Sequence, residues 1–115
     1  MKLGEAISQA DAMRPNAIDE VTKARWVLGL ESELAETWGC RFPEEEDIHD
    51  PEYELIVPFP KDEVYPLYLC AMIDNAQEET TLYANDASIA NQALTDVKAW
   101  YRRTHRAKKI PIRGL

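Results

Sequence analysis

Apolar residues recur at intervals of three and four in several stretches of this chain, which is the spacing of one face of an α-helix. The clearest stretch covers residues 17–38, where the apolar face is broad enough to contact neighbours on more than one side. The same spacing predicts helices over residues 2–13, from 62 to about 79, and from about 85 to 105. The predicted fold class is therefore all-α.

Local signals predict where these helices begin and end. Asn16 follows an Arg-Pro break and is expected to cap the second helix, which Gly39 should end. Asp62 is expected to cap the third helix, with Pro66 in its opening turn, where the missing N–H costs little. Because a short connection follows, the last two helices should form an antiparallel hairpin against which the second helix packs.

The helical spacing is lost over residues 40–61, where acids and prolines concentrate. Seven acidic residues fall between positions 44 and 54, and four prolines fall between 43 and 60. The acidic residues are Glu44, Glu45, Glu46, Asp47, Asp50, Glu52 and Glu54. We expect a long, irregular surface loop with a brief extended stretch at 53–57, and long loops of this kind are often functional. It lacks the glycine and the ligand spacing of a calcium loop, which favours a solvated loop.

The charges of the chain are segregated along its length. The last fourteen residues hold six of the thirteen Lys and Arg and no acid, whereas all twenty-one Asp and Glu precede them. A net charge of −8 argues against general affinity for nucleic acid, which requires a cationic face. We therefore divide the chain into one helical domain, residues 1–106, and a basic C-terminal arm, residues 107–115.

The arm is predicted to be extended, because Pro111 restricts the residue before it. Its alternating cationic and β-branched residues would allow it to add a strand to an exposed sheet edge of a partner protein. The candidate docking residues are Lys108, Lys109, Ile110, Pro111, Ile112, Arg113 and Leu115.

The sequence contains none of the common catalytic motifs. It has no glycine-rich phosphate loop, no nucleophile elbow and no HExxH zinc motif, and neither His49 nor His105 has partners at metal-ligand spacing. We therefore expect no enzymatic activity, no cofactor and no metal. Cys40 and Cys70 form no CxxC pattern and are expected to be reduced and partly buried. No apolar run predicts a signal peptide or a membrane span, so we expect synthesis in a cytosol and no membrane partner.

The predicted hairpin carries a distinctive layout. It reads YxxYxxAxxD from Tyr65, YxND from Tyr83, an asparagine at Asn91 and an aromatic-Arg helix end at Tyr101. The preceding long helix contains Ala-Arg-Trp and Leu-Glu-x-Glu-Leu elements. Over residues 18–106 this layout resembles the small head–tail connector proteins of long-tailed bacteriophages and prophages, the adaptor or head-completion family.

The resemblance implies a structural virion protein without catalytic activity, assembled in the host cytoplasm and located in the neck of the particle. Such proteins form a ring, usually of twelve copies, beneath the capsid portal. Their C-terminal arms dock on the portal, and the lower ring surface accepts the next head-completion (stopper) or tail-terminator protein. Genome DNA passes through the channel without specific binding. The sequence departs from many relatives in its long acidic 43–60 connection, which leaves open which loop meets the neighbouring ring. The carboxylates of this connection are candidates for a channel wall or an inter-ring contact.

Two other classes of function remain open from the residues alone. One is a small cytosolic helical regulator, DNA-binding or antitoxin-like, that uses the basic C-terminal tail. The overall acidity and the absence of a convincing helix-turn-helix argue against it. The other is an enzyme subunit that uses the carboxylates of residues 44–54, for which the sequence offers no partner base or nucleophile.

Overall fold

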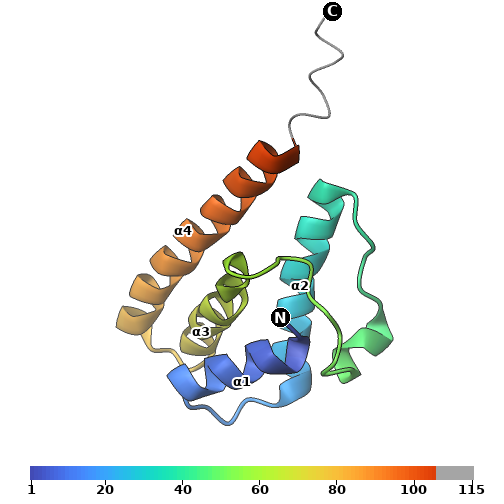
Figure 1. Cartoon of the computed structure of the whole chain (residues 1–115). Coiled ribbons are helices and arrows are strands. Elements are labelled where there is room, and N and C mark those ends of the chain that lie inside the picture. The colour runs from blue at the N-terminus through green and yellow to red at the C-terminus, as the bar shows by residue number, and fades with distance from the viewer. Residues whose placement is uncertain (106–115) are drawn as a thin grey trace, which may run out of the picture.

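The helical spacing of the sequence becomes four α-helices in the computed structural model, which describes residues 1–105 (Figure 1). The helices are α1 (Leu3–Met13), α2 (Glu20–Trp38), α3 (Val64–Ala76) and α4 (Thr80–His105), with short 3-10 helices η1 (Glu45–His49) and η2 (Lys61–Glu63). Over the described range, β-pairing is limited to one isolated antiparallel bridge between Lys2 and Glu54. The predicted all-α class is confirmed.

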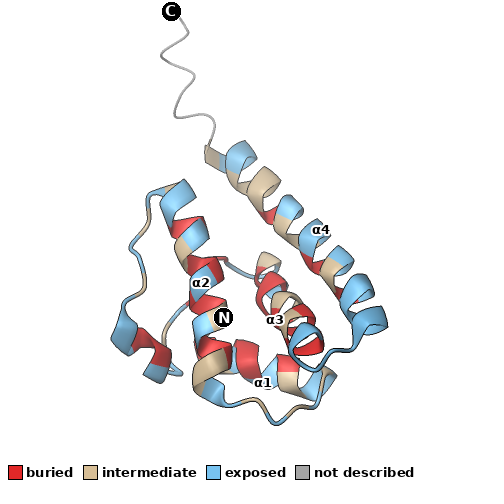
Figure 2. Ribbon diagram, turned by 180° about the vertical axis from the view of Figure 1, so that it is seen from behind, coloured by how far each residue is buried: buried red, intermediate tan, exposed pale blue. Residues whose placement is uncertain are grey.

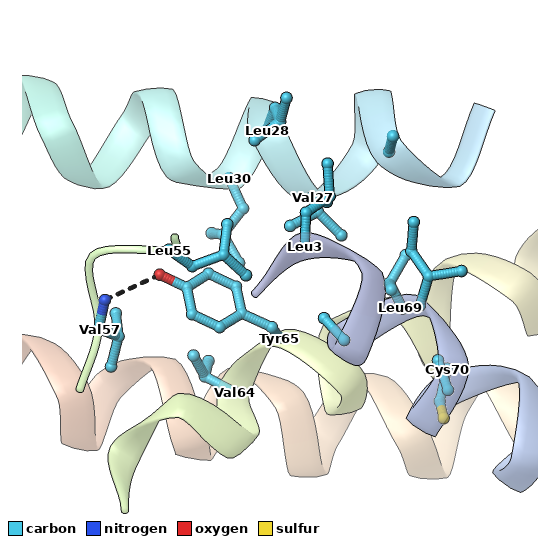
Figure 3. Close-up of a cluster of buried hydrophobic side chains, with 14 of the residues drawn as sticks. Leu3, Val27, Leu28, Leu30, Leu55, Val57, Val64, Tyr65, Leu69 and Cys70 are labelled. Atoms are coloured by element: carbon cyan, nitrogen blue, oxygen red, sulfur yellow. Dashed lines mark hydrogen bonds between the residues drawn. The ribbon is translucent and has the colours of Figure 1, made fainter. Parts of the chain in front are cut away.

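Helix α3 occupies the centre of the fold and contacts the other three helices. It is buried along most of its length, whereas α4 is buried along a narrow stripe only (Figure 2). Leu55 and Val57, from the connection before η2, pack against the core between α1, α2 and α3 and complete it (Figure 3). Each helix therefore buries its apolar stripe against α3 or a neighbour of α3, as amphipathic helices must.

The predicted start of α2 was wrong. Its N-cap is Asp19, whose side chain accepts a hydrogen bond from the amide of Thr22 at 3.2 Å. Asn16 has a different task, because its Oδ1 accepts from the Ile18 amide at 3.0 Å and from the Lys23 ammonium at 3.1 Å. It therefore holds the α1–α2 connection. The predicted end at Gly39 is confirmed, with a left-handed backbone (φ 71°, ψ 28°) that glycine adopts without steric cost.

The predicted boundary between the last two helices was also misplaced. The chain turns at residues 77–79, where Glu78 has a φ of 59° and the Glu79 amide donates to the Asp74 carbonyl at 2.9 Å. Helix α4 then begins at Thr80, so the sequence around Tyr83, which predicted a turn, lies inside the helix. With 26 residues, α4 is about 39 Å long. The turn thus lies upstream of the Asn-Asp pair that signalled it.

Asp62 does not cap α3. It lies in η2, and its carboxylate is 3.4 Å from the N-terminal amine of Met1. The residue at the N-cap of α3 is Glu63, which makes no side-chain capping bond. Asp62 therefore ties η2 to the start of the chain.

The acidic connection is only partly a solvent-facing loop, and the prediction is corrected here. It contains η1, and it buries Asp47, Ile48, Leu55 and Val57. Its backbone pairs with the first residues of the chain, since the Leu3 amide donates to the Tyr53 carbonyl at 2.8 Å and the Leu55 amide to the Met1 carbonyl at 3.0 Å. These bonds hold the segment over the core.

A buried carboxylate fixes the end of this segment against α2 and α3. Glu31 of α2 is fully buried, and its two oxygens accept from the Ile56 amide and from the Tyr65 hydroxyl, each at 2.6 Å. The Tyr65 hydroxyl in turn accepts from the Val57 amide at 3.0 Å (Figure 3). Burial raises the pKa of Glu31, and the two donors oppose that shift. Four polar groups that would be costly to bury alone thereby satisfy one another.

We expect Tyr65→Phe to lower the free energy of unfolding by about 1–3 kcal/mol, because it removes a donor to Glu31 and the acceptor of the Val57 amide. Urea unfolding followed by circular dichroism measures this change. Tyr68→Phe is the matched control, since within residues 1–105 the half-buried Tyr68 hydroxyl makes no hydrogen bond. Equal losses in the two variants would contradict the role given to the network.

Candidate assembly surface

An ionic cluster attaches α4 to α1 and α3. Arg14, the C-cap of α1, places its guanidinium 2.8 Å from Asp86 Oδ2 of α4 and 3.3 Å from Asp74 Oδ1 of α3. Asp74 is fully buried, and neither of its carboxylate oxygens has a hydrogen-bond partner among the described residues. One cation therefore faces two carboxylates in a water-poor joint between three helices.

The negative charge of the Asp74 carboxylate is poorly compensated by its surroundings. Burial first, and then the neighbouring Asp86, raise the pKa of Asp74 to about 6, whereas Arg14 acts in the opposite direction. Burial disfavours an ionised carboxylate, and two adjacent carboxylates resist ionising together. A proton held by Asp74 would give it a hydrogen bond to donate toward Asp86, so the joint is best satisfied in its singly protonated form.

The far end of α4 is held by aromatic stacking. Tyr101 stacks on Trp38 of α2 with ring centroids 4.2 Å apart, and its hydroxyl donates to the Trp38 carbonyl at 3.3 Å. Trp100 meets Trp38 edge to face, and the His105 ring stacks on Tyr101 at 3.7 Å. The C-terminal ends of α2 and α4 are therefore joined, so α4 is anchored at both ends.

Between these anchors α4 exposes a surface without charge. Asp86 is the only charged residue from position 80 to position 95, and it is buried against Arg14. Leu82, Tyr83 and Ile89 remain 41%, 39% and 45% exposed. A shallow hollow on the same helix is lined by Ala84, Ala87, Ser88, Asn91, Gln92 and Thr95. These nine residues form what we call the uncharged face of α4.

Such a surface is unusual in this protein. Charged residues make up 30% of the chain, yet about four turns of a largely exposed helix present none to solvent. Depletion of charge together with exposed tyrosine and aliphatic side chains is typical of the centre of a protein–protein interface. The uncharged face of α4 is therefore the candidate functional surface, and none of the sequence motifs described above predicted it.

The acidic residues predicted as a possible channel or inter-ring surface do not act as one group. Four are paired within the fold: Glu45 with Arg25, Asp47 with Arg41, Glu52 with Lys2 and Glu54 with the N-terminal amine. The remaining three, Glu44, Glu46 and Asp50, are exposed. In the part of the chain that the structure describes, no three His, Cys, Asp or Glu side chains gather as metal ligands would. Much of the negative charge therefore stabilises the segment itself.

A hollow with a volume of about 610 Å³ lies between α1, α2 and η1. Its charged lining includes Lys2 and Glu52, which pair with each other at 2.7 Å. His49 also lines it, whereas His105 belongs to the aromatic cluster described above. The hollow therefore combines a neutralised ion pair with a mixed polar and apolar wall.

Several other sequence predictions can be placed. Cys40 and Cys70 are free thiols, one half-buried and one buried, as expected. The predicted arm residues, 107–115, lie outside the described range.

The sequence did not predict the ionic cluster of Arg14, Asp74 and Asp86. Asp74 and Asp86 belong to the layout of the predicted hairpin, and Arg14 belongs to the break before the second helix. The sequence signal that could have indicated this cluster is that Asp74 and Asp86 are each a single acid in an otherwise uncharged helical stretch. Within residues 1–105, no helix is both long and apolar enough to cross a bilayer.

The Asp74 joint predicts an unusual pH dependence. The folded pKa lies above the ordinary value, so the native state keeps a proton that the unfolded chain releases, and this contribution to stability is lost as the pH rises from about 4 to about 6. Asp74→Asn should therefore raise the free energy of unfolding at pH 7.5 by roughly 1–3 kcal/mol and change it little at pH 4.

Chemical unfolding at the two pH values measures the effect, with Asp96→Asn, at an exposed position of α4, as control. A loss of stability at pH 7.5 in Asp74→Asn would instead mean that the fold requires Asp74 as an ionised partner of Arg14.

Comparison of the chain with protein-family models, with curated proteins and with solved structures found no match.

Proposed function

We propose that this protein is a self-assembling structural subunit, and that its setting is the head–tail connector ring of a long-tailed phage or prophage. The observation that carries the proposal is the uncharged face of α4. The resemblance of the sequence to connector proteins supplies the setting, and the face supplies a physical reason for copies to associate.

The face favours association because covering it removes apolar surface from water without burying a charge. Leu82, Tyr83 and Ile89 together offer apolar area worth about 25 cal/mol for each Å² removed from water. The charge that α4 does carry in this stretch, on Asp86, is already neutralised by Arg14 inside the fold. A neighbouring subunit would therefore meet no desolvation penalty for an ion at the centre of the contact.

The remaining parts of the proposal follow the resemblance. The ring joins the portal to the downstream stopper or tail-terminator protein, with α3 and α4 as its antiparallel hairpin and residues 107–115 as the portal-docking arm. The exposed carboxylates of Glu44, Glu46 and Asp50 belong to a body whose acidity would repel DNA phosphates. DNA would then pass through the ring without specific binding. No enzymatic step, cofactor or metal forms part of the proposal.

Native mass spectrometry of the full chain, alone and mixed with a portal protein if a neighbouring gene encodes one, tests the proposed function. We expect a closed ring in at least one of these samples. The double variant Leu82→Glu and Ile89→Glu should lose the ring by placing two carboxylates in the interface, while its melting temperature stays close to that of the parent because both sites are exposed.

Ala12→Glu, on the exposed side of α1, is the control that adds charge elsewhere and should keep the ring. A chain that remains monomeric in both samples would contradict the proposal. A dimer that retards a DNA fragment at physiological salt would instead favour the regulatory function.

A further inference from the structure

Helix α2 contains a glycine that the described fold does not explain. Gly29 lies in the middle of the helix on its exposed side, where glycine is less favourable than alanine. A Cβ atom added there would meet no atom within 4 Å, so no close packing inside residues 1–105 requires its absence. The missing side chain does leave the α2 backbone open to close approach by another chain.

The surface beside Gly29 contains a hollow that is open to another chain. This hollow of about 200 Å³ runs between α2 and residues 43–48, which include the start of η1. It is lined by Arg25, Leu28, Gly29, Ser32, Pro43, Glu44, Glu45 and Ile48. Arg25 is paired with Glu45 across the hollow, whereas Glu44 and the nearby Glu36 are exposed without an ion-pair partner in the described residues. The surface is thus open at its centre and acidic at its edge.

Gly29 and the uncharged face of α4 lie on different sides of one copy. In both whole-chain views α3 lies between α4 and α2, and the segment around η1 lies beyond α2 (Figures 1 and 2). Helices α2 and α4 also run in roughly the same direction (Figure 1). A neighbour related by rotation about an axis along these helices would therefore bring its α4 alongside this α2, running in roughly the same direction.

The outward residues of the two helices match at seven-residue spacing, which is two helical turns. They are Thr22, Gly29 and Glu36 on α2, and Ser88, Thr95 and Arg102 on α4. If Thr95 lies over Gly29, then Ser88 lies over Thr22 and Arg102 lies over Glu36. The first two pairs consist of small residues, and the third pair carries opposite charges. Arg102 is exposed, and no ion pair engages it within residues 1–105. The register thus combines close approach with complementary charge.

We infer that residues 86–95 of the uncharged face of α4 pack across residues 20–29 of α2 in the neighbouring copy, with Thr95 over Gly29, head to tail around the ring. This inference rests on the proposed self-assembly and names the surface that α4 meets. Because the two surfaces differ, the contact is heterologous and each copy uses both, which closes a ring where the rotation per copy allows it. The 19 residues of α2 limit the strip to about 28 Å in length, and with a width of about 10 Å it offers about 280 Å² per partner. That is about a third of what each partner of a stable pair buries, so closed rings should form without stable dimers.

Cysteine cross-linking tests the contact directly. One sample carries Thr22→Cys and the other Ser88→Cys, which face each other in this register and are close to cysteine in size, both with Cys40→Ser to remove the half-buried native thiol. The two are mixed under the conditions in which the parent assembles and are then oxidised. We expect disulfide-linked pairs of unlike chains, since the bond requires Cα atoms about 4.4–6.8 Å apart. Ala12→Cys paired with Ser88→Cys is the control.

Three results are distinguishable. Unlike pairs well above the control support the inference. Rings without such pairs, or with like pairs only, overturn it and leave the proposed function intact. Failure to assemble, alone or with the portal protein, together with no cross-link overturns both.

Substitution of Gly29 separates assembly from folding. Gly29→Ala should raise the melting temperature of the monomer by roughly 4 °C, because alanine favours the helix and its Cβ meets no atom. The same change should weaken ring formation, and Gly29→Leu should abolish it at equal protein concentration. Thermal unfolding and native mass spectrometry give the two readouts. Rings of undiminished abundance in Gly29→Leu would show that α4 does not approach this position.

Discussion

The hydrogen-bonded carboxylate of Glu31 is the interaction on which the rest of the fold depends. It lies where α2, α3 and the end of the acidic connection meet, and it accepts from the Tyr65 hydroxyl and the Ile56 amide at 2.6 Å each. A buried carboxylate without donors would cost several kcal/mol, so the connection must follow a path that supplies them. That path places Leu55 and Val57 over the core, and only then can α3 be enclosed on all sides.

A second polar joint determines what α4 presents to solvent. Arg14 pairs with Asp86 and draws the only acid in the first four turns of α4 into the fold. Asp74 is fully buried beside them, so this joint holds two carboxylates and one cation. The stability of the fold therefore depends on whether Asp74 is protonated. The stacked Trp38 and Tyr101 rings anchor the other end. The outcome is a long helix fixed at both ends whose exposed middle is uncharged, which is a surface suited to a partner.

Sequence reasoning recovered the helices because periodicity reports which side chains face a core. It placed α1 and the end of α2 at Gly39 well, since each depends on residues close in sequence. It failed at the start of α2, at the turn before α4 and over residues 44–54. Over residues 44–54 the deciding partner is distant in the sequence, since the backbone of Leu3 pairs with Tyr53. At the start of α2 the partners are near, but Ile18 and Lys23 engage the Asn16 side chain in place of a cap. Capping rules cannot tell a side chain that caps from one engaged elsewhere.

The sequence by itself determined the all-α class, the helical stretches, the free cysteines and the segregation of charge, because these follow from local spacing and composition. Only the tertiary structure decided which charges are used internally. It pairs Asp86 with Arg14 and Glu45 with Arg25, and it leaves Gly29 open on α2 without an internal reason. The physical cause is that pairing and exposure depend on which elements meet in space. A helix with one acid therefore becomes an uncharged face only once that acid has found its partner on another helix.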